Sequence, residues 1–164
     1  MGQNVTGHVT HIAQMNWGIL RADWDDPSVA EFVENLDRVN RIAMRSPGFV
    51  WMMPEEEMDA AQNDAEGVFG GNPRTASTLS VWETPQALDH FVHNTVHASF
   101  MARSDEWQVP QKTRQYVIWP ILAGHRPTLK EAKVRLDGLS ANGPSPEAYD
   151  FPYLRRRLSR TEAA

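Results

Sequence analysis

Two helix starts of the same kind divide this sequence, one at Asp26–Pro27 and one at Thr84–Pro85. In each, a side chain that caps helices precedes a proline at the first helical position, where the missing N–H would have no partner anyway. Apolar residues then recur at helical spacing up to the SPG turn at residues 46–48, and the second helix can run to about Trp107. The sequence therefore predicts two long amphipathic helices.

Four short runs rich in strand-forming residues alternate with these helices. They are residues 11–20, 49–53, 75–83 and 113–122. The order β-α-β-β-α-β predicts an α+β fold with a ferredoxin-like subunit, a four-stranded antiparallel sheet with both helices on one face. A third, shorter helix is expected after the capping-box residues Thr128 and Glu131.

The strand at residues 11–20 is apolar on both sides. Ile12 and Leu20 point one way, whereas Met15 and Trp17 point the other. Neither face of the sheet is then expected to be exposed to solvent, and the face without helices has to be buried. We expect a second subunit to bury it, so the sequence predicts a homodimer joined through its sheets.

We expect one domain over residues 1–143, because a chain of 164 residues has the size of a single domain with a real core. Residues 54–74 are acidic, glycine-rich and too long for an ordinary hairpin, so they form either a mobile lid or a disordered insertion, and we expect disorder. Residues 144–164 are expected to be a C-terminal extension. Its arginines are predicted to be solvated, namely Arg155, Arg156, Arg157 and Arg160.

The composition excludes several classes of function. The 16 Lys and Arg against 21 Asp and Glu give a net charge of −5, whereas nucleic-acid-binding proteins usually carry a concentrated basic face. Without cysteine there is no disulfide, thiolate nucleophile or thiolate-bound metal. The N-terminus lacks a signal-peptide pattern, and no run of about 18 apolar residues could span a membrane. We therefore expect a cytoplasmic protein that binds neither nucleic acid nor membrane.

Three histidines, His90, His93 and His97, fall close together in the second predicted helix. On one continuous helix they lie in a sector of roughly 60°, almost opposite the packing face. His93 and His97 have the i, i+4 spacing of two metal ligands, but no partner carboxylate is obvious, so we predict no metal ion there. The alternative is that all three are ordinary surface or interface imidazoles.

Several motifs together resemble the uncharacterised DUF3291 family: HIAQMN, DDPSVAEFVENLDRVN, SPGFVW, LSVWET, AGHRPT, EAKVRL and GPSPEAY. That family is similar to the antibiotic-biosynthesis-monooxygenase-like group of the dimeric α+β barrel superfamily. The resemblance implies paired ferredoxin-like sheets and a cavity between each sheet and its helices. The superfamily includes cofactor-free oxygenases of aromatic polyketides, haem-degrading enzymes and proteins without known chemistry.

The resemblance also singles out Asn16 and His97. Asn16 falls where haem-degrading relatives keep an asparagine that contacts the reacting molecule, and His97 falls where DUF3291 proteins carry a histidine. Without a cofactor, His97 would be a general base and Asn16 would hydrogen-bond the resulting oxyanion. With haem, His97 would be the axial ligand, although Met101 falls at the ligand position of the haem-degrading enzymes.

The predicted ligand is a flat, mostly apolar small molecule held against His93 and a set of large side chains. These are Trp17, Trp51, Trp82, Phe100 and Met101. Three functions stay open: a monooxygenase-like enzyme, a haem-binding protein, and a non-catalytic binding or stress protein. His125 precedes the third helix and is expected to hydrogen-bond backbone there.

Overall fold

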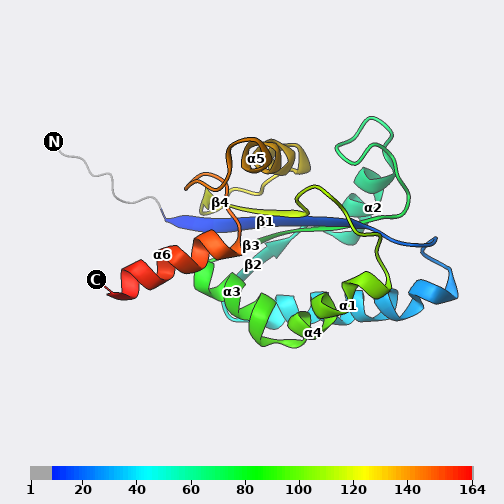
Figure 1. Cartoon of the computed structure of the whole chain (residues 1–164), viewed down its shortest axis with the longest axis horizontal. Helices are drawn as coiled ribbons and strands as arrows, with labels where there is room; N and C mark the ends of the chain where they lie inside the picture. Colours follow the sequence, from blue (N-terminus) through cyan, green and yellow to red (C-terminus); the bar gives the residue numbers. More distant parts are fainter. Residues whose placement is uncertain (1–8, 164) are drawn as a thin grey trace.

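The computed structural model describes residues 9–163. Its centre is a four-stranded antiparallel sheet in the order β2-β3-β1-β4. The strands are β1 (Thr10–Ile19), β2 (Phe49–Met52), β3 (Thr75–Trp82) and β4 (Tyr116–Leu122). The helices are α1 (Ala30–Arg45), α2 (Glu55–Asn63), α3 (Pro85–Asn94), α4 (Val96–Ala102), α5 (Leu129–Asn142) and α6 (Phe151–Ala163), with 3-10 turns at Pro27–Val29 and Ser104–Glu106. The predicted ferredoxin-like α+β fold is confirmed (Figure 1).

The predicted helix caps are present. The Ser28 N–H donates to Asp26 Oδ1 at 2.8 Å, before a 3-10 turn that leads into α1. The Ala87 N–H donates to Thr84 Oγ1 at 3.1 Å, with Pro85 at the first position of α3. Each cap satisfies a backbone donor that has no partner inside its helix.

The predicted single helix from Pro85 to Trp107 is wrong, because Thr95 divides it into α3 and α4. Thr95 is extended, with φ −126° and ψ −172°. Its hydroxyl donates to the Phe91 carbonyl at 2.6 Å and accepts from the His97 N–H at 3.2 Å. The same side chain thus ends one helix and caps the next, and the i, i+4 relation expected for His93 and His97 does not apply.

The prediction that residues 54–74 lack regular structure is also wrong, because α2 lies within them. Met58 packs into the core from α2. Gln62 is buried, and its Oε1 accepts a hydrogen bond from the Ser77 N–H of β3 at 2.9 Å. Because β2 has already ended at Met52, this side chain satisfies a β3 donor that no neighbouring strand reaches.

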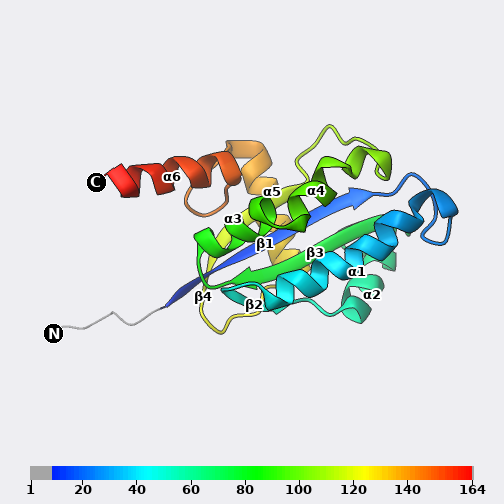
Figure 2. The same cartoon turned by 90° about the horizontal axis from the view of Figure 1, so that it is seen from below.

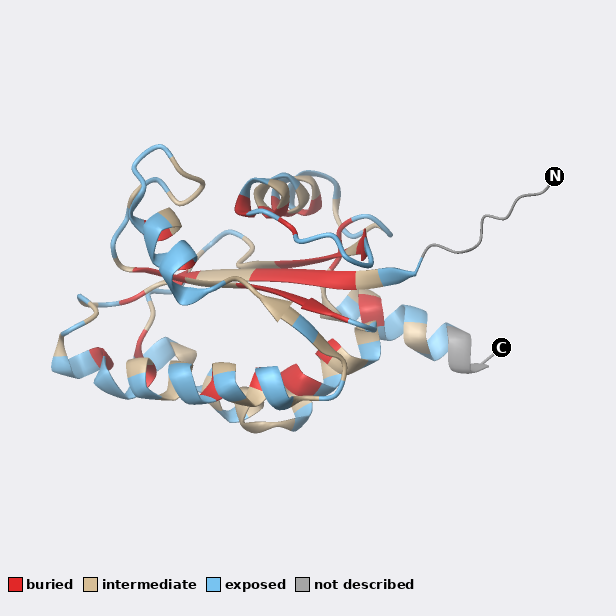
Figure 3. Ribbon diagram, turned by 180° about the vertical axis from the view of Figure 1, so that it is seen from behind, coloured by how far each residue is buried: buried red, intermediate tan, exposed pale blue. Residues whose placement is uncertain are grey.

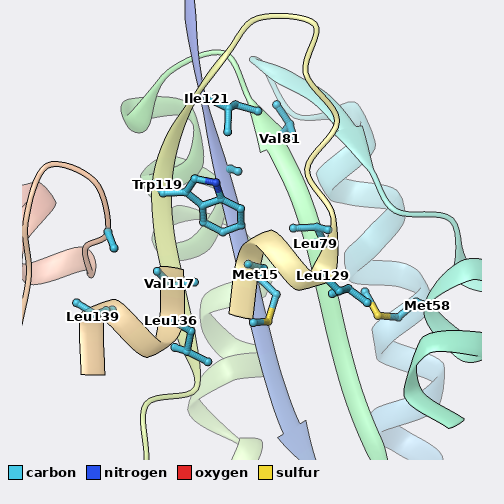
Figure 4. Packing of buried hydrophobic residues seen from close by; sticks show 13 residues of the cluster. Met15, Met58, Leu79, Val81, Val117, Trp119, Ile121, Leu129, Leu136 and Leu139 are labelled. Atoms are coloured by element: carbon cyan, nitrogen blue, oxygen red, sulfur yellow. The ribbon is translucent and has the colours of Figure 1, made fainter. Parts of the chain in front are cut away.

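Helices lie on both faces of the sheet. Figure 1 and Figure 2 show α1, α3 and α4 on one face, as predicted, and α5 and α2 on the other. Buried residues follow the middle of the strands and the inner sides of the helices (Figure 3). The second face is apolar, and Figure 4 shows Val117 of β4 beside Leu136 and Leu139 of α5, with Trp119 further along the same strand toward Ile121. The face that we expected a second subunit to bury is thus covered by helices of this chain. The homodimer stays a prediction, but an uncovered apolar sheet face no longer supports it.

Glu131 joins α5 to the sheet below it. Its Oε2 accepts from Trp119 Nε1 at 3.0 Å, and its Oε1 lies 2.7 Å from His125 Nε2. Burial raises the pKa of Glu131, but the hydrogen bonds from His125 and Trp119 outweigh burial, and the net pKa lies below its usual range. The expectation that His125 bonds backbone at this helix is corrected, since its ring bonds the Glu131 side chain.

The segment from Ala148 to Leu154 lies against the sheet. Tyr149 and Ile118 of β4 exchange two backbone hydrogen bonds, at 2.9 and 2.8 Å. Leu154 of α6 is buried in the core cluster that includes Ile118. In the described part of the chain no helix is long and apolar enough to cross a membrane. The expectation for the first residues of the N-terminus concerns residues 1–8, which lie outside the described range.

Candidate functional site

The sheet face under α1, α3 and α4 is apolar at its two ends and small or polar in the middle. The apolar ends are Ile12, Trp82 and Ile118 in one core cluster and Leu20 and Ala76 in another. Between them, Gln14 pairs with Ser80 and Asn16 pairs with Thr78. These short side chains do not fill the space under the helices, and a cavity of about 530 Å³ lies there. Its volume is within the range of small-molecule sites.

Six of the eight predicted site residues border this cavity: Asn16, Trp17, His93, His97, Phe100 and Met101. Phe100 stacks on Phe32 at 5.3 Å between ring centroids and on Trp107 at 5.4 Å. Met101 is 44% exposed and lies at the rim. Trp17 borders the cavity, but it also packs against the core on the opposite face of the sheet, and its Nε1 donates to the Arg114 carbonyl at 3.0 Å.

Trp51 and Trp82 do not line the cavity, which contradicts their predicted role. Trp82 is fully buried in the core, between the rings of Phe49 and Phe91 at 5.5 and 5.1 Å. Trp51 packs against the core on the α5 side of the sheet, with the Arg126 guanidinium 5.7 Å from its ring. Both are structural residues. The bulge in β2 turns Trp51 to the α5 face, whereas Trp82 lies on the cavity face but is enclosed by Phe49 and Phe91 at its apolar end.

The two ring nitrogens of His97, which borders the cavity, differ in their surroundings. Its Nδ1 lies 3.2 Å from the Val92 carbonyl. A carbonyl oxygen can only accept, so Nδ1 carries the proton and Nε2 keeps a free lone pair in the neutral ring. Burial lowers the pKa of His97, the hydrogen bond to Val92 opposes this, and the charge of His93 lowers the pKa further. The net pKa lies below its usual value, so the ring is neutral at pH 7.

The cavity floor carries a network of amides and hydroxyls. Asn16 Nδ2 donates to Gln14 Oε1 at 3.0 Å and to Thr78 Oγ1 at 2.8 Å. Gln14 is 6% exposed, and its Nε2 has no hydrogen-bond partner among residues 9–163. A buried donor without an acceptor costs about 1–3 kcal/mol. A ligand oxygen that accepts a hydrogen bond from Gln14 Nε2 would therefore gain more binding free energy than at a surface whose donors already have partners.

His93 and His90 have separate environments. The Nδ1 of His93 lies 2.9 Å from Asp89 Oδ1 and 3.2 Å from the Asp89 carbonyl, and its ring meets Phe151 edge-on at 4.7 Å. His90 is exposed, and its Nδ1 lies 3.2 Å from Asn94 Nδ2. Within the described residues, no group of three or more His, Cys, Asp and Glu side chains could hold a metal ion.

A second cavity of about 760 Å³ lies between α1 and α2. It shares part of its lining with the first cavity, namely Leu36, Asn40, Met52, Ser77 and Thr78. Four methionines surround it, Met44, Met52, Met53 and Met58. Methionine side chains adapt easily to a passing apolar group, so the side of the site toward α2 is deformable.

Gln14, Tyr116 and Arg155 are among the polar cavity residues that sequence reasoning missed. The signal for Gln14 was available, since it lies two positions before Asn16 and strand alternation places both on one face. Tyr116 pairs with Asn16 across the sheet, and burial raises its pKa despite the hydrogen bond from Phe151. No signal in the sequence connects Arg155 with a strand more than 100 positions away.

Fold and site together define a single-sheet ferredoxin-like domain with a cavity between its sheet and the helices α1, α3 and α4. The chain belongs to the family described as a domain of unknown function, DUF3291, whose family model matches residues 11–162. A comparison with proteins of curated function gives no match.

Solved structures with similar folds include proteins from Nitrosomonas europaea, Methanosarcina mazei and Streptomyces nogalater. A protein of unknown function from Nitrosomonas europaea has 12% identity and a TM-score of 0.45, over 74% of this chain and 97% of that one. A conserved protein from Methanosarcina mazei has 14% identity and a TM-score of 0.45, over 69% and 92%. SnoaB, a cofactor-independent oxygenase from Streptomyces nogalater, has 15% identity and a TM-score of 0.41, over 73% and 96%. These likenesses are too distant to assign an activity.

Proposed function

We propose that this protein binds a flat, mostly apolar small molecule under α3 and α4 and acts on it as a monooxygenase-like enzyme without a cofactor. One observation carries the proposal. His97, at the wall of a cavity of about 530 Å³, has its Nδ1 on the Val92 carbonyl. This geometry leaves Nε2 as a base that is already deprotonated at pH 7, the form that general-base catalysis needs.

The proposed chemistry begins with a proton transfer. The O–H bond of a phenol-like substrate breaks, the proton goes to His97 Nε2, and the electron pair stays on the substrate oxygen. Both protons of Asn16 Nδ2 are already donated, to Gln14 and Thr78. The oxyanion would therefore accept a hydrogen bond from Gln14 Nε2, which has no partner, while Asn16 orients this amide through its bond to Gln14 Oε1. A ring carbon of the electron-rich anion then forms a C–O bond to dioxygen, the second substrate, and the resulting peroxide takes the proton back from His97. Loss of water from this hydroperoxide breaks the O–O bond and leaves a quinone, so the substrate itself supplies the electrons that reduce the second oxygen atom.

The pH dependence of oxygen uptake tests this role. With a hydroxynaphthalene as substrate, we expect kcat/KM to be constant near pH 7 and to fall only below pH 6.5, the usual pKa of histidine, because burial lowers the pKa of His97. The same lowered pKa predicts that the stabilising effect of neutral His97 is complete above pH 6.5 and is lost as pH falls, since the unfolded chain binds the proton more readily. An acidic limb centred above pH 6.5 would contradict the assignment.

Haem is a second candidate ligand, favoured by the same free Nε2. An imidazole whose Nδ1–H is fixed on a carbonyl is oriented as metal-binding histidines usually are, and Phe100 and Met101 provide apolar wall. His97 would hold the iron, and haem would supply the activation of oxygen. A Soret shift on titration with haem, present in the native protein and absent in His97→Ala, would favour this candidate over the cofactor-free one.

A non-catalytic carrier is the alternative of another class. It predicts ligand binding without turnover that survives His97→Ala, since the affinity would come from the apolar walls. A homodimer remains our proposal on the family resemblance alone, and a location in the cytoplasm remains our proposal on the sequence. Sedimentation velocity at micromolar concentration decides the first, and a stable monomer would overturn it.

A further inference from the structure

The permanent charge in the lining of the cavity is of one sign only. Among the described residues that line it, the only permanently charged side chain is that of Arg155, and no Asp or Glu is present. The other lining residues are apolar, neutral and polar, or the two histidines His93 and His97. A low-dielectric cavity with one fixed positive charge favours a ligand that carries one negative charge.

Arg155 has a defined position at the cavity wall. It lies in the first turns of α6, after Phe151 and Pro152, which also line the cavity. The start of α6 is fixed by the Phe151 N–H, which donates to the Tyr116 hydroxyl at 3.0 Å, and by buried Leu154. The Arg155 side chain is 55% exposed. Its guanidinium thus lies where the apolar interior meets solvent.

The carboxylate nearest to Arg155 does not form a hydrogen bond with the guanidinium, so the N–H donors of Arg155 remain available to a ligand. Arg155 Nη2 lies 3.6 Å from Asp89 Oδ1, a distance too long for a hydrogen bond. The same Asp89 oxygen lies closer to His93 Nδ1, at 2.9 Å. No hydrogen bond of Arg155 to any of residues 9–163 accompanies this loose pair. A guanidinium has five donors arranged to hold a carboxylate through two bonds.

We propose that Arg155 binds the carboxylate of the ligand, so that the substrate class is a flat, largely apolar carboxylic acid whose acid group stays at the α6 end while its ring system lies over the polar floor. The proposal rests on the cavity assigned above as the ligand site, but not on His97 acting as a base. It also gives one arginine of the C-terminal segment a role different from that of its neighbours. Arg156 and Arg157 lie instead 6.0 and 5.7 Å from the Tyr153 ring.

A pair of probes with the same ring system tests this. Calorimetric titration at pH 7.5 compares 2-naphthoate with 2-naphthamide, which has the same shape and no charge. We expect the native protein to bind the carboxylate about three- to tenfold more tightly, as a partly exposed, charge-assisted pair allows. In Arg155→Gln the two probes should bind equally, and Arg155→Lys should keep part of the preference. The matched control is Arg156→Gln, which removes the same charge from the next, exposed position and should change nothing.

Each other outcome overturns the proposal. Equal binding of the two probes to the native protein, or a preference that survives Arg155→Gln, shows that Arg155 does not bind the acid. Loss of the preference in Arg156→Gln as well shows that only the overall charge of the segment matters. Failure of both probes to bind removes the cavity as a ligand site. A failure of the proposed enzyme function alone would look different, because oxygen uptake would be absent while the naphthoate preference remained.

Discussion

The His97→Ala variant is expected to lose about 10²–10⁴-fold in kcat for oxygen uptake, the usual contribution of a positioned general base. The loss follows from removing the one ring whose Nδ1 is fixed on a backbone carbonyl and whose Nε2 is free at the cavity wall. Binding of a neutral probe such as 2-naphthamide should change little, since Phe91 and Phe100 still enclose the cavity. Oxygen uptake and calorimetric titration on the same preparations measure the two effects.

The other two histidines are the controls for this prediction. His90→Ala should keep full activity, because His90 is exposed and lies outside the cavity lining. His93→Ala should have an intermediate effect, because its ring lies against Asp89 and Phe151 at the cavity edge. If His93→Ala lost more activity than His97→Ala, the base would have been assigned to the wrong residue. Full activity of His97→Ala would remove general-base catalysis by this ring altogether.

Trp119→Ala should lower the free energy of unfolding by about 3–5 kcal/mol, the range found when a buried aromatic side chain is truncated. Trp119 is fully buried beneath α5, and its Nε1 donates to Glu131 Oε2 at 3.0 Å. The substitution leaves a cavity in the core cluster on the α5 face and takes one donor from a partly buried carboxylate. Urea denaturation followed by circular dichroism measures the change, with the midpoint as the readout.

Trp51→Ala is the matched control, because Trp51 packs against the same core cluster but is only half-buried. We expect it to cost about 1–2 kcal/mol, in proportion to the smaller area it buries. A cost for Trp119→Ala below that for Trp51→Ala would mean that α5 does not cover this face in solution. The second-subunit explanation for the buried sheet face would then regain its basis.

Local signals in the sequence were sufficient for most of the fold. The caps at Asp26 and Thr84 and the four strand-forming runs act over a few residues, so they predict helix starts and strands without knowledge of the rest of the chain. The same local chemistry could have revealed the helix break at Thr95. A threonine within reach of the Phe91 carbonyl and the His97 N–H competes with the helix for both groups.

The sequence predicted only part of the candidate site, and the physical reason is different from that for the fold. The sequence selected Asn16 and His97, which both line the cavity. Whether a tryptophan lines a cavity or fills a core depends on which face its strand presents, and a bulge between Phe49 and Trp51 shifts that register.

The sequence by itself determined the order of strands and the principal helix starts, because backbone propensities and caps are properties of neighbouring residues. Only the tertiary structure decided what covers each face of the sheet and what surrounds the cavity. The helix α5 buries the face opposite the cavity, and Gln62 reaches Ser77 from a segment predicted to be disordered. Arg155 meets a cavity built on β1, more than 100 residues earlier in the chain. Such contacts depend on burial between segments far apart in sequence, which no local pattern encodes.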